Sequence, residues 1–188
     1  TPFLLLAFIY AGIRYNAIGF HSYTVTDVTN SPYIYATYSD AFATKTFVVL
    51  KYILLLFLPV YLTTEYGFEQ IPMIQIRSFL FIISAVCILA LLSFAVLTFK
   101  KKSIVSFCIL YFFITLSPGT NFIIDLGAPM AERMLFQASL AFCILLSILI
   151  LKFSANYRYA SIGLALIISI LFSVKTIARN SEWKNNET

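Results

Sequence analysis

Long runs of apolar residues, separated by short polar connections, make up nearly all of this chain of 188 residues. The clearest runs cover residues 78–99, 134–151 and 160–177, and each is long enough to cross a hydrocarbon core of ~30 Å as a helix. A shorter run, 104–116, would rise only about 20 Å at 1.5 Å per residue. It spans only where the bilayer thins or where its flanks help.

The first third of the chain allows two interpretations. Residues 2–13 close a membrane helix that Arg14 stops, and residues 15–43 form a Tyr-rich, nearly uncharged link of the kind found at membrane interfaces. The run 44–62 follows, and Pro59 should kink or end its helix because proline has no N–H to donate. If this run crosses fully, the link before it is cytoplasmic; if the run is re-entrant, the link is external.

Composition sets the class of protein. Hydrophobic residues make up 61% of the chain and charged residues 11%, whereas a soluble domain is near half apolar and a quarter charged. We therefore predict an all-α fold, a polytopic transmembrane helical bundle of about five to six membrane helices. Three cysteines (Cys87, Cys108 and Cys143) lie inside apolar runs and His21 is alone, so no metal site is predicted.

The basic residues predict a topology rather than a nucleic-acid partner. They gather at the ends of apolar runs, as the positive-inside rule describes. The three lysines at 100–102, and Lys152 with Arg158, therefore mark two cytoplasmic loops. Alternation then places residues 63–77, residues 119–131 and the C-terminal tail on the external side.

The candidate site is the polar, Pro/Gly-broken connection at residues 117–139, which carries the acid–base pair Glu132–Arg133. An ionisable residue at a membrane edge is a candidate for function. Pro129 predicts a helix start, which sets the pair in the first turns, where the positive helix end and a guanidinium suit a phosphate. Alternatively, the Arg133 side chain only extends to the membrane interface to keep its charge in water, and Glu132 only interacts favourably with the positive end of the helix dipole.

Other polar residues have two interpretations each. Glu65 and Glu69 are carboxylates of an external loop, suited to a base or a sugar-hydroxyl acceptor, or are simply solvated. Asn121 and Asp125 bind a sugar or turn their loop. The segment 179–183 is typical of an interfacial anchor. Phosphate-loop, zinc-protease and nucleophile-elbow motifs are missing, as are the intramembrane acids and inverted repeats of a coupled transporter.

Three stretches of sequence carry a resemblance to a known family. They are KYILLLFLPVYLTTEYGFEQIP from residue 51, NFIIDLGAPMAERMLFQASLAFCILL from residue 121 and KTIARNSEWKNNET from residue 175. Together they resemble the membrane part of the transmembrane-and-TPR O-mannosyltransferase family and its bacterial relatives. The A-E-R triplet and the R-N-x-x-W ending are the specific parts. Departures include Glu65, where the family has Asp, and Phe136, where it has Tyr.

The resemblance implies a GT-C-type fold that transfers a sugar from a polyprenyl-phosphate carrier on the external face. It implies that Arg133 binds the carrier phosphate, that Glu65 and Glu132 are supporting acids, and that Tyr66 and Asn121 bind substrate. The main catalytic acid is then expected upstream of this chain. No cofactor is implied, because the polyprenyl-phosphate-linked sugar is the donor substrate.

The implied organisation is a transmembrane region, residues 1–178, and an external polar tail, residues 179–188, leading to TPR repeats that would bind protein acceptors. Membrane lipids are the other expected partners, and a bacterial inner membrane is favoured over the endoplasmic reticulum. We expect enzyme activity of the full-length parent and none of this piece alone. The alternative is a non-catalytic membrane anchor or scaffold that displays TPR repeats.

Overall fold

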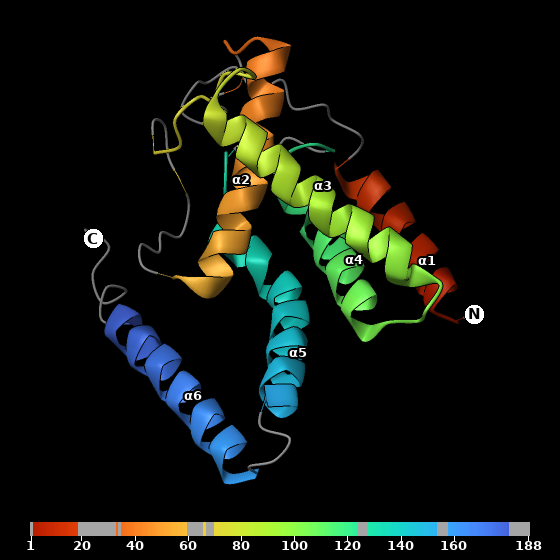
Figure 1. Ribbon diagram of the computed structural model, residues 1–188. Helices are drawn as coiled ribbons and strands as arrows, with labels where there is room; N and C mark the ends of the chain where they lie inside the picture. Colours follow the sequence, from red (N-terminus) through yellow and green to blue (C-terminus); the bar gives the residue numbers. More distant parts are fainter. Residues whose placement is uncertain are drawn as a thin grey trace.

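The computed structural model describes residues 2–18, 33, 35–59, 66, 70–123, 128–153 and 158–180. Within these ranges all regular structure is helical (Figure 1), so the predicted all-α fold is confirmed. The α-helices are α1 (Pro2–Ile18), α2 (Tyr38–Phe57), α3 (Phe79–Phe99), α4 (Ile104–Leu116), α5 (Leu135–Phe153) and α6 (Arg158–Asn180), and the 3-10 turns are η1 (Ser117–Thr120) and η2 (Glu132–Met134).

Three helical segments of the described chain are long and apolar enough to cross a membrane: Phe79–Phe99, Glu132–Lys152 and Ser161–Ala178. Two shorter helical segments, Leu4–Ala17 and Ile104–Thr120, are also apolar. These lengths and compositions are those of a helical membrane bundle, in which every backbone N–H and C=O must be paired inside the protein. The chain is accordingly a membrane protein.

Several helix boundaries follow from local chemistry and agree with the prediction. The Ser78 hydroxyl accepts a hydrogen bond of 3.3 Å from the Leu80 N–H and so caps α3. Helix α4 has the predicted bounds. Helix α2 ends at Phe57, two residues before Pro59, because a residue that precedes proline is disfavoured in the helical conformation.

Two predicted boundaries are wrong. Helix α1 continues through Arg14, whose guanidinium lies 3.4 Å from the Tyr10 hydroxyl one turn earlier, so an exposed helical face accommodates the charge. Helix α2 begins at Tyr38, inside the predicted link. The Thr44 and Thr46 hydroxyls each donate to the carbonyl four residues before, which satisfies these polar groups within the helix.

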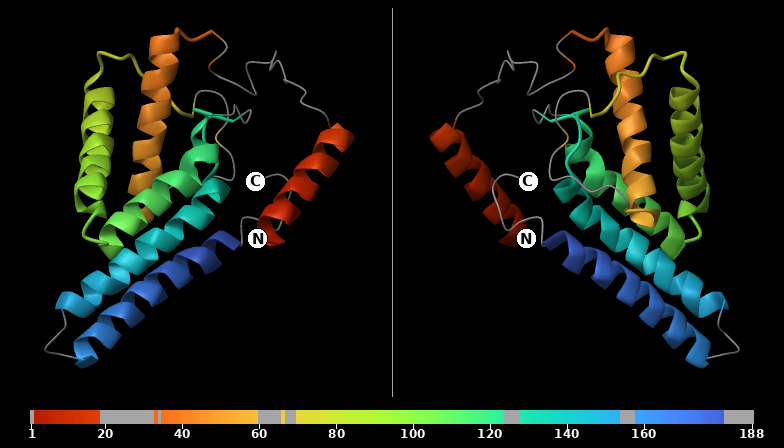
Figure 2. Two further views of the ribbon diagram at one scale, coloured as in Figure 1. Left: turned by 90° about the vertical axis from the view of Figure 1, so that its right-hand side faces the viewer. Right: turned by 90° about the vertical axis from the view of Figure 1, so that its left-hand side faces the viewer.

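Helices α2 and α3 lie side by side and run in the same direction (Figure 2). Near their starts the Phe42 and Phe81 rings meet edge to face with centroids 6.2 Å apart. Helix α4 then returns along α3, and the Ser106 hydroxyl donates to the Ala95 carbonyl at 2.6 Å. Helices α2 and α3 thus start at the same end of the described bundle. Both interpretations of residues 44–62, a full crossing and a re-entrant segment, stay predictions.

The core lies where α2 meets α4, the start of α5 and the connection between those two helices. Its largest members are buried completely or nearly so: Val48, Tyr52, Cys108, Phe112, Leu116 and Met130. Outside this core, the described side chains of α1 from Leu4 to Ala17 are exposed, and α6 packs against α5 without a buried residue in its apolar stretch. Of the residues that the structure describes, those around the candidate site are therefore the best packed.

Candidate functional site at the connection between α4 and α5

The polar connection between α4 and α5 lies lengthwise along α2. At one end the Lys45 ammonium donates to the Asn121 carbonyl at 2.6 Å. Two helical turns further on, the Tyr52 hydroxyl reaches Ala131. Lys45 and Tyr52 are seven residues apart, so they lie on one face of the helix. Helix α2 therefore fixes both ends of the connection.

The contact between Tyr52 and Ala131 closes the connection, and we call it the Tyr52 clasp. The buried Tyr52 hydroxyl accepts from the Ala131 N–H at 2.9 Å and donates to the Ala131 carbonyl at 3.0 Å. The Gly119 carbonyl is 3.4 Å from the same hydroxyl. A Cβ at Gly119 would lie 2.6 Å from the Met134 Cβ, so only glycine lets η1 approach η2 this closely.

Asn121 shapes the loop that follows η1. Its φ of 59° is left-handed, a conformation that asparagine tolerates better than most residues. Its side-chain amide is buried and donates to the carbonyls of Ala128 at 2.7 Å and Pro129 at 3.2 Å. These bonds give the loop-turning role that the sequence allowed. A sugar contact of Asn121 stays a prediction.

Glu132 and Arg133 begin η2, which leads directly into α5. The expected position in the first helical turn is therefore confirmed, although Pro129 does not start the helix. Pro129 is buried, and its carbonyl accepts a hydrogen bond from the Asn121 side-chain amide. Ala131, two residues later, is extended (φ −143°, ψ 122°), so helical structure begins only at Glu132. Glu132 is half-buried, and Arg133 is exposed.

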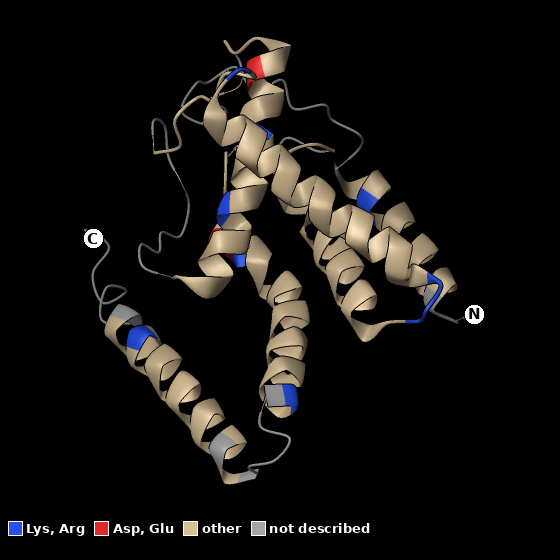
Figure 3. Cartoon of the chain, in the orientation of Figure 1, with Lys and Arg blue, Asp and Glu red and all other residues tan. Residues whose placement is uncertain are grey.

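Tyr66 joins this turn from the segment after α2. Its N–H donates to the Met130 carbonyl at 3.2 Å, and its hydroxyl donates to Glu132 Oε1 at 3.3 Å. The Lys51 ammonium lies 5.4 Å from the centre of the Tyr66 ring, within the range of a cation–π contact. We call Lys51, Tyr66, Glu132 and Arg133 the Arg133 group. Figure 3 shows how sparse charged residues are along the described helices.

Sequence reasoning assigned no role to Lys51 or Tyr52. The signal that could have found them is the K-Y pair with which the first family-like stretch begins. Of the other predicted candidates, Glu65, Glu69, Asp125 and the segment after Asn180 lie outside the described residues. Among the residues that the structure describes, no group of three or more His, Cys, Asp or Glu could hold a metal ion.

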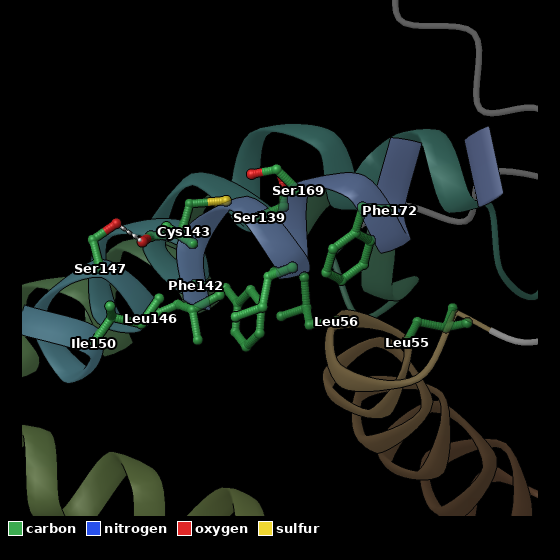
Figure 4. A pocket seen from close by; sticks show the side chains of 12 residues that line it. Leu55, Leu56, Ser139, Phe142, Cys143, Leu146, Ser147, Ile150, Ser169 and Phe172 are labelled. Carbon is green, nitrogen blue, oxygen red and sulfur yellow. Dashed lines mark hydrogen bonds between the residues drawn. The ribbon is translucent and has the colours of Figure 1, made fainter. Parts of the chain in front are cut away.

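An apolar groove of about 450 Å³ runs beside α5 (Figure 4). Its α5 side recurs at three- and four-residue spacing, which places it on one helical face: Ser139, Phe142, Cys143, Leu146, Ser147 and Ile150. The end of α2 and one side of α6 complete the lining. The Ser147 hydroxyl donates to the Cys143 carbonyl at 2.8 Å, so its hydrogen bond is made within the helix and the groove stays apolar. The groove starts six residues after Arg133.

Comparison with known proteins gives two relatives. The chain is 29% identical to a protein O-mannosyl-transferase of Caenorhabditis elegans over 139 residues, which are 74% of this chain and 20% of the relative. It is 28% identical to a protein O-mannosyl-transferase of Mus musculus over 170 residues, which are 84% of this chain and 17% of that relative. The chain thus spans no more than about a fifth of either relative.

No family model matches the chain. No solved structure matches it either. The resemblance expected from the three motif stretches is nevertheless confirmed by the two relatives, both of which carry the same enzyme name. Over most of its length, this membrane chain is similar to protein O-mannosyl-transferases.

Proposed function

We propose that the chain is part of the membrane domain of a glycosyltransferase that takes its sugar from a polyprenyl-phosphate carrier and transfers it on the external face. The names of the two relatives support the reaction class. The Arg133 group supports a phosphate site, and the groove along α5 supports a place for a polyprenyl tail. The activity is that of the full-length protein.

The observation that carries the proposal is an exposed arginine on a turn that the core holds in place. The Tyr52 clasp fixes the backbone two residues before Arg133. A guanidinium is planar and always charged, and it can bind two phosphate oxygens at once. Because the turn is held before any ligand arrives, less ordering is needed when a phosphate binds.

Glu132 is proposed as a supporting acid rather than the main base. Its carboxylate would repel a phosphate at the neighbouring Arg133, but the Tyr66 hydroxyl already occupies Oε1. The hydrogen bond from Tyr66 therefore orients the Glu132 carboxylate and partly offsets its negative charge, which lowers the repulsion of a phosphate. The same proposal includes Glu65 as a second supporting acid and Tyr66 and Asn121 as substrate contacts.

The apolar groove along α5 is proposed for the first isoprene units of the carrier. From Ser139 to Ile150 helix α5 rises about 16 Å at 1.5 Å per residue. Because a polyprenyl tail in the bilayer is already surrounded by hydrocarbon, van der Waals packing against these side chains, rather than transfer from water, favours its binding along that length. A tail in this groove would leave its phosphate near the start of α5, where Arg133 lies.

The remaining parts of the proposal concern the whole protein. TPR repeats after this region would bind protein acceptors, and the main catalytic acid would lie before it. The tail after α6 would face the external side of a bacterial inner membrane, in line with a cytoplasmic position for the lysine-rich turn after α3 and for Lys152 in the last turn of α5.

The test uses the full-length protein in membranes. Arg133→Ala should weaken polyprenyl-phosphate binding about tenfold or more and reduce sugar transfer, because it removes a charge-assisted hydrogen bond of about 1.5–3 kcal/mol. Arg133→Lys should retain part of both. The matched control is Arg77→Ala, which removes another exposed arginine just before α3 and should change neither.

The alternative is a non-catalytic anchor that displays TPR repeats. In that case Arg133→Ala and Arg77→Ala would both leave polyprenyl-phosphate binding and transfer unchanged. Equal polyprenyl-phosphate binding and transfer by the two variants would mean that Arg133 is only an interfacial residue without a role in a phosphate site.

A further inference from the structure

A second groove, of about 830 Å³, lies along α4 and extends to the turn between α3 and α4; we call its end at this turn the mouth. This turn is at the end of the two helices away from Asn121 and the Tyr52 clasp. The groove shares no lining residue with the Arg133 group or with the groove along α5. It is therefore a separate feature, and the following inference does not rest on the proposed function.

The wall of this groove is the outward face of α4. Phe107, Leu110 and Ile114 line it at spacings of three and four residues, which place them on one side of the helix. Phe107 is 61% exposed and Ile114 is 69% exposed. The other side of α4, with Cys108 and Phe112, is packed into the core. The wall is thus a surface that suits hydrocarbon.

The mouth of the groove is cationic. Lys100 and Lys102 line it, whereas Lys101 between them does not. The turn is fixed, since the N–H groups of Lys101 and Lys102 donate to the carbonyls of Thr98 and Phe99 at 3.1 and 3.0 Å. Lys102 has a left-handed φ of 51°, which is uncommon for a residue with a Cβ. Two of the three lysines of this turn thus line the groove.

We propose that this groove binds one anionic glycerophospholipid, with its phosphate at Lys100 and Lys102 and one acyl chain along α4. Charge and length both favour this occupant. Two lysines at one mouth match a headgroup of net negative charge, as in other basic clusters next to membrane helices. From Ile104 to Ile114 the helix rises about 15 Å, half of a hydrocarbon core of ~30 Å. A single leaflet's acyl chain fits that length.

The shortness of α4 gives such a lipid a structural role. Helix α4 has 13 residues, or about 20 Å, whereas α3, which ends at the same lysine turn, has 21 residues, or about 31 Å. The lysine turn therefore reaches headgroup depth at the end of α3, and α4 returns only part of the way across a hydrocarbon core of ~30 Å. A phospholipid held at Lys100 and Lys102 moves with the protein and fills the space beside the short helix.

The experiment measures retention of pyrene-labelled phosphatidylglycerol and phosphatidylcholine by the full-length protein in nanodiscs. We expect Lys100→Gln and Lys102→Gln each to lower the retention of phosphatidylglycerol about fivefold, as about 1 kcal/mol per lysine implies. Lys101→Gln removes the same charge from the same turn without touching the groove, and it should change retention little. Ile114→Trp, which fills the apolar wall, should lower retention with every lysine present.

Four results would overturn the proposal. Equal losses for Lys100→Gln, Lys101→Gln and Lys102→Gln would mean general attraction to a charged surface. Equal retention of the two lipids by the unsubstituted protein would mean ordinary solvation. Displacement of the phosphatidylglycerol by substoichiometric polyprenyl phosphate would identify a carrier site. Failure of a lipophilic maleimide to label Phe107→Cys would mean that other protein covers the groove.

Discussion

The hydroxyl of Tyr52 is bound to both backbone groups of Ala131, although 79 residues separate them. It accepts from the amide at 2.9 Å and donates to the carbonyl at 3.0 Å. One buried side chain thus determines where the chain enters η2. The position of Arg133, two residues later, depends on a hydroxyl group in the C-terminal third of α2.

Tyr52→Phe keeps the buried ring and removes only this hydroxyl. The Ala131 carbonyl still accepts from the Met134 N–H, but the Ala131 amide loses the acceptor that the structure gives it. An unpaired buried donor costs about 1–3 kcal/mol. We expect a lower thermal unfolding midpoint in detergent together with weaker polyprenyl-phosphate binding. Tyr38→Phe is the control, because Tyr38 is 96% exposed. Equal midpoints for the two variants would contradict the role of the clasp.

Gly119→Ala tests the close approach of η1 to η2. The new Cβ would lie 2.6 Å from the Met134 Cβ, and neither atom can move without its backbone. Overpacking of this kind costs about 1–3 kcal/mol, so unfolding should occur at a lower temperature. Met134→Ala should not rescue the variant, since alanine keeps the Cβ. Gly163→Ala meets nothing within 4 Å, and it should be neutral or slightly stabilising because alanine favours helix.

Asn121→Leu should destabilise the loop in two ways. Leucine tolerates a left-handed φ poorly, at a cost of about 1–2 kcal/mol, and it cannot donate to the carbonyls of Ala128 and Pro129. Asn121→Gly retains the backbone conformation and loses only the amide, so it should be the milder change. Unfolding midpoints of both variants measure the difference. If glycine proves as harmful as leucine, the left-handed backbone is not the reason for asparagine here.

Tyr66→Phe should weaken polyprenyl-phosphate binding about two- to fivefold. The variant removes the hydrogen bond to Glu132 Oε1, worth about 0.5–1.5 kcal/mol, and leaves that carboxylate to oppose a phosphate at Arg133. In a Glu132→Gln background the same change should have little further effect. A full additional loss in that background would mean that Tyr66 acts independently of Glu132.

The sequence predicts local features well where one residue decides them. Pro59 stops α2, Ser78 caps α3, and unbroken apolar letters delimit α4. It fails where a polar residue is absorbed by its own helix, as Arg14 is in α1 and as Thr44 is in α2. The Tyr52 clasp could not be predicted, because no periodic pattern joins residues so distant in the chain. The parallel course of α2 and α3 likewise depends on packing.

The sequence predicts only those parts of the candidate site that are local in the chain. Glu132 and Arg133 stand out as an adjacent acid and base beside an apolar run, and Asn121 stands out in a Pro/Gly-rich loop. Tyr66 reaches Glu132, and Lys51 reaches the Tyr66 ring, only through folding, since the three residues come from different segments of the chain. Polar residues that are close together in the sequence are therefore predictable as a site, whereas contacts between distant segments that meet beside α2 are not.

The most direct test is photo-crosslinking of the full-length protein with a polyprenyl phosphate that carries a photoreactive group in its first isoprene units. The predicted result is labelling of the α5 groove, between Ser139 and Ile150, that Arg133→Ala suppresses and Arg77→Ala does not. Labelling concentrated along α4, near Lys100 and Lys102, and unaffected by Arg133→Ala would contradict a carrier site at the start of α5.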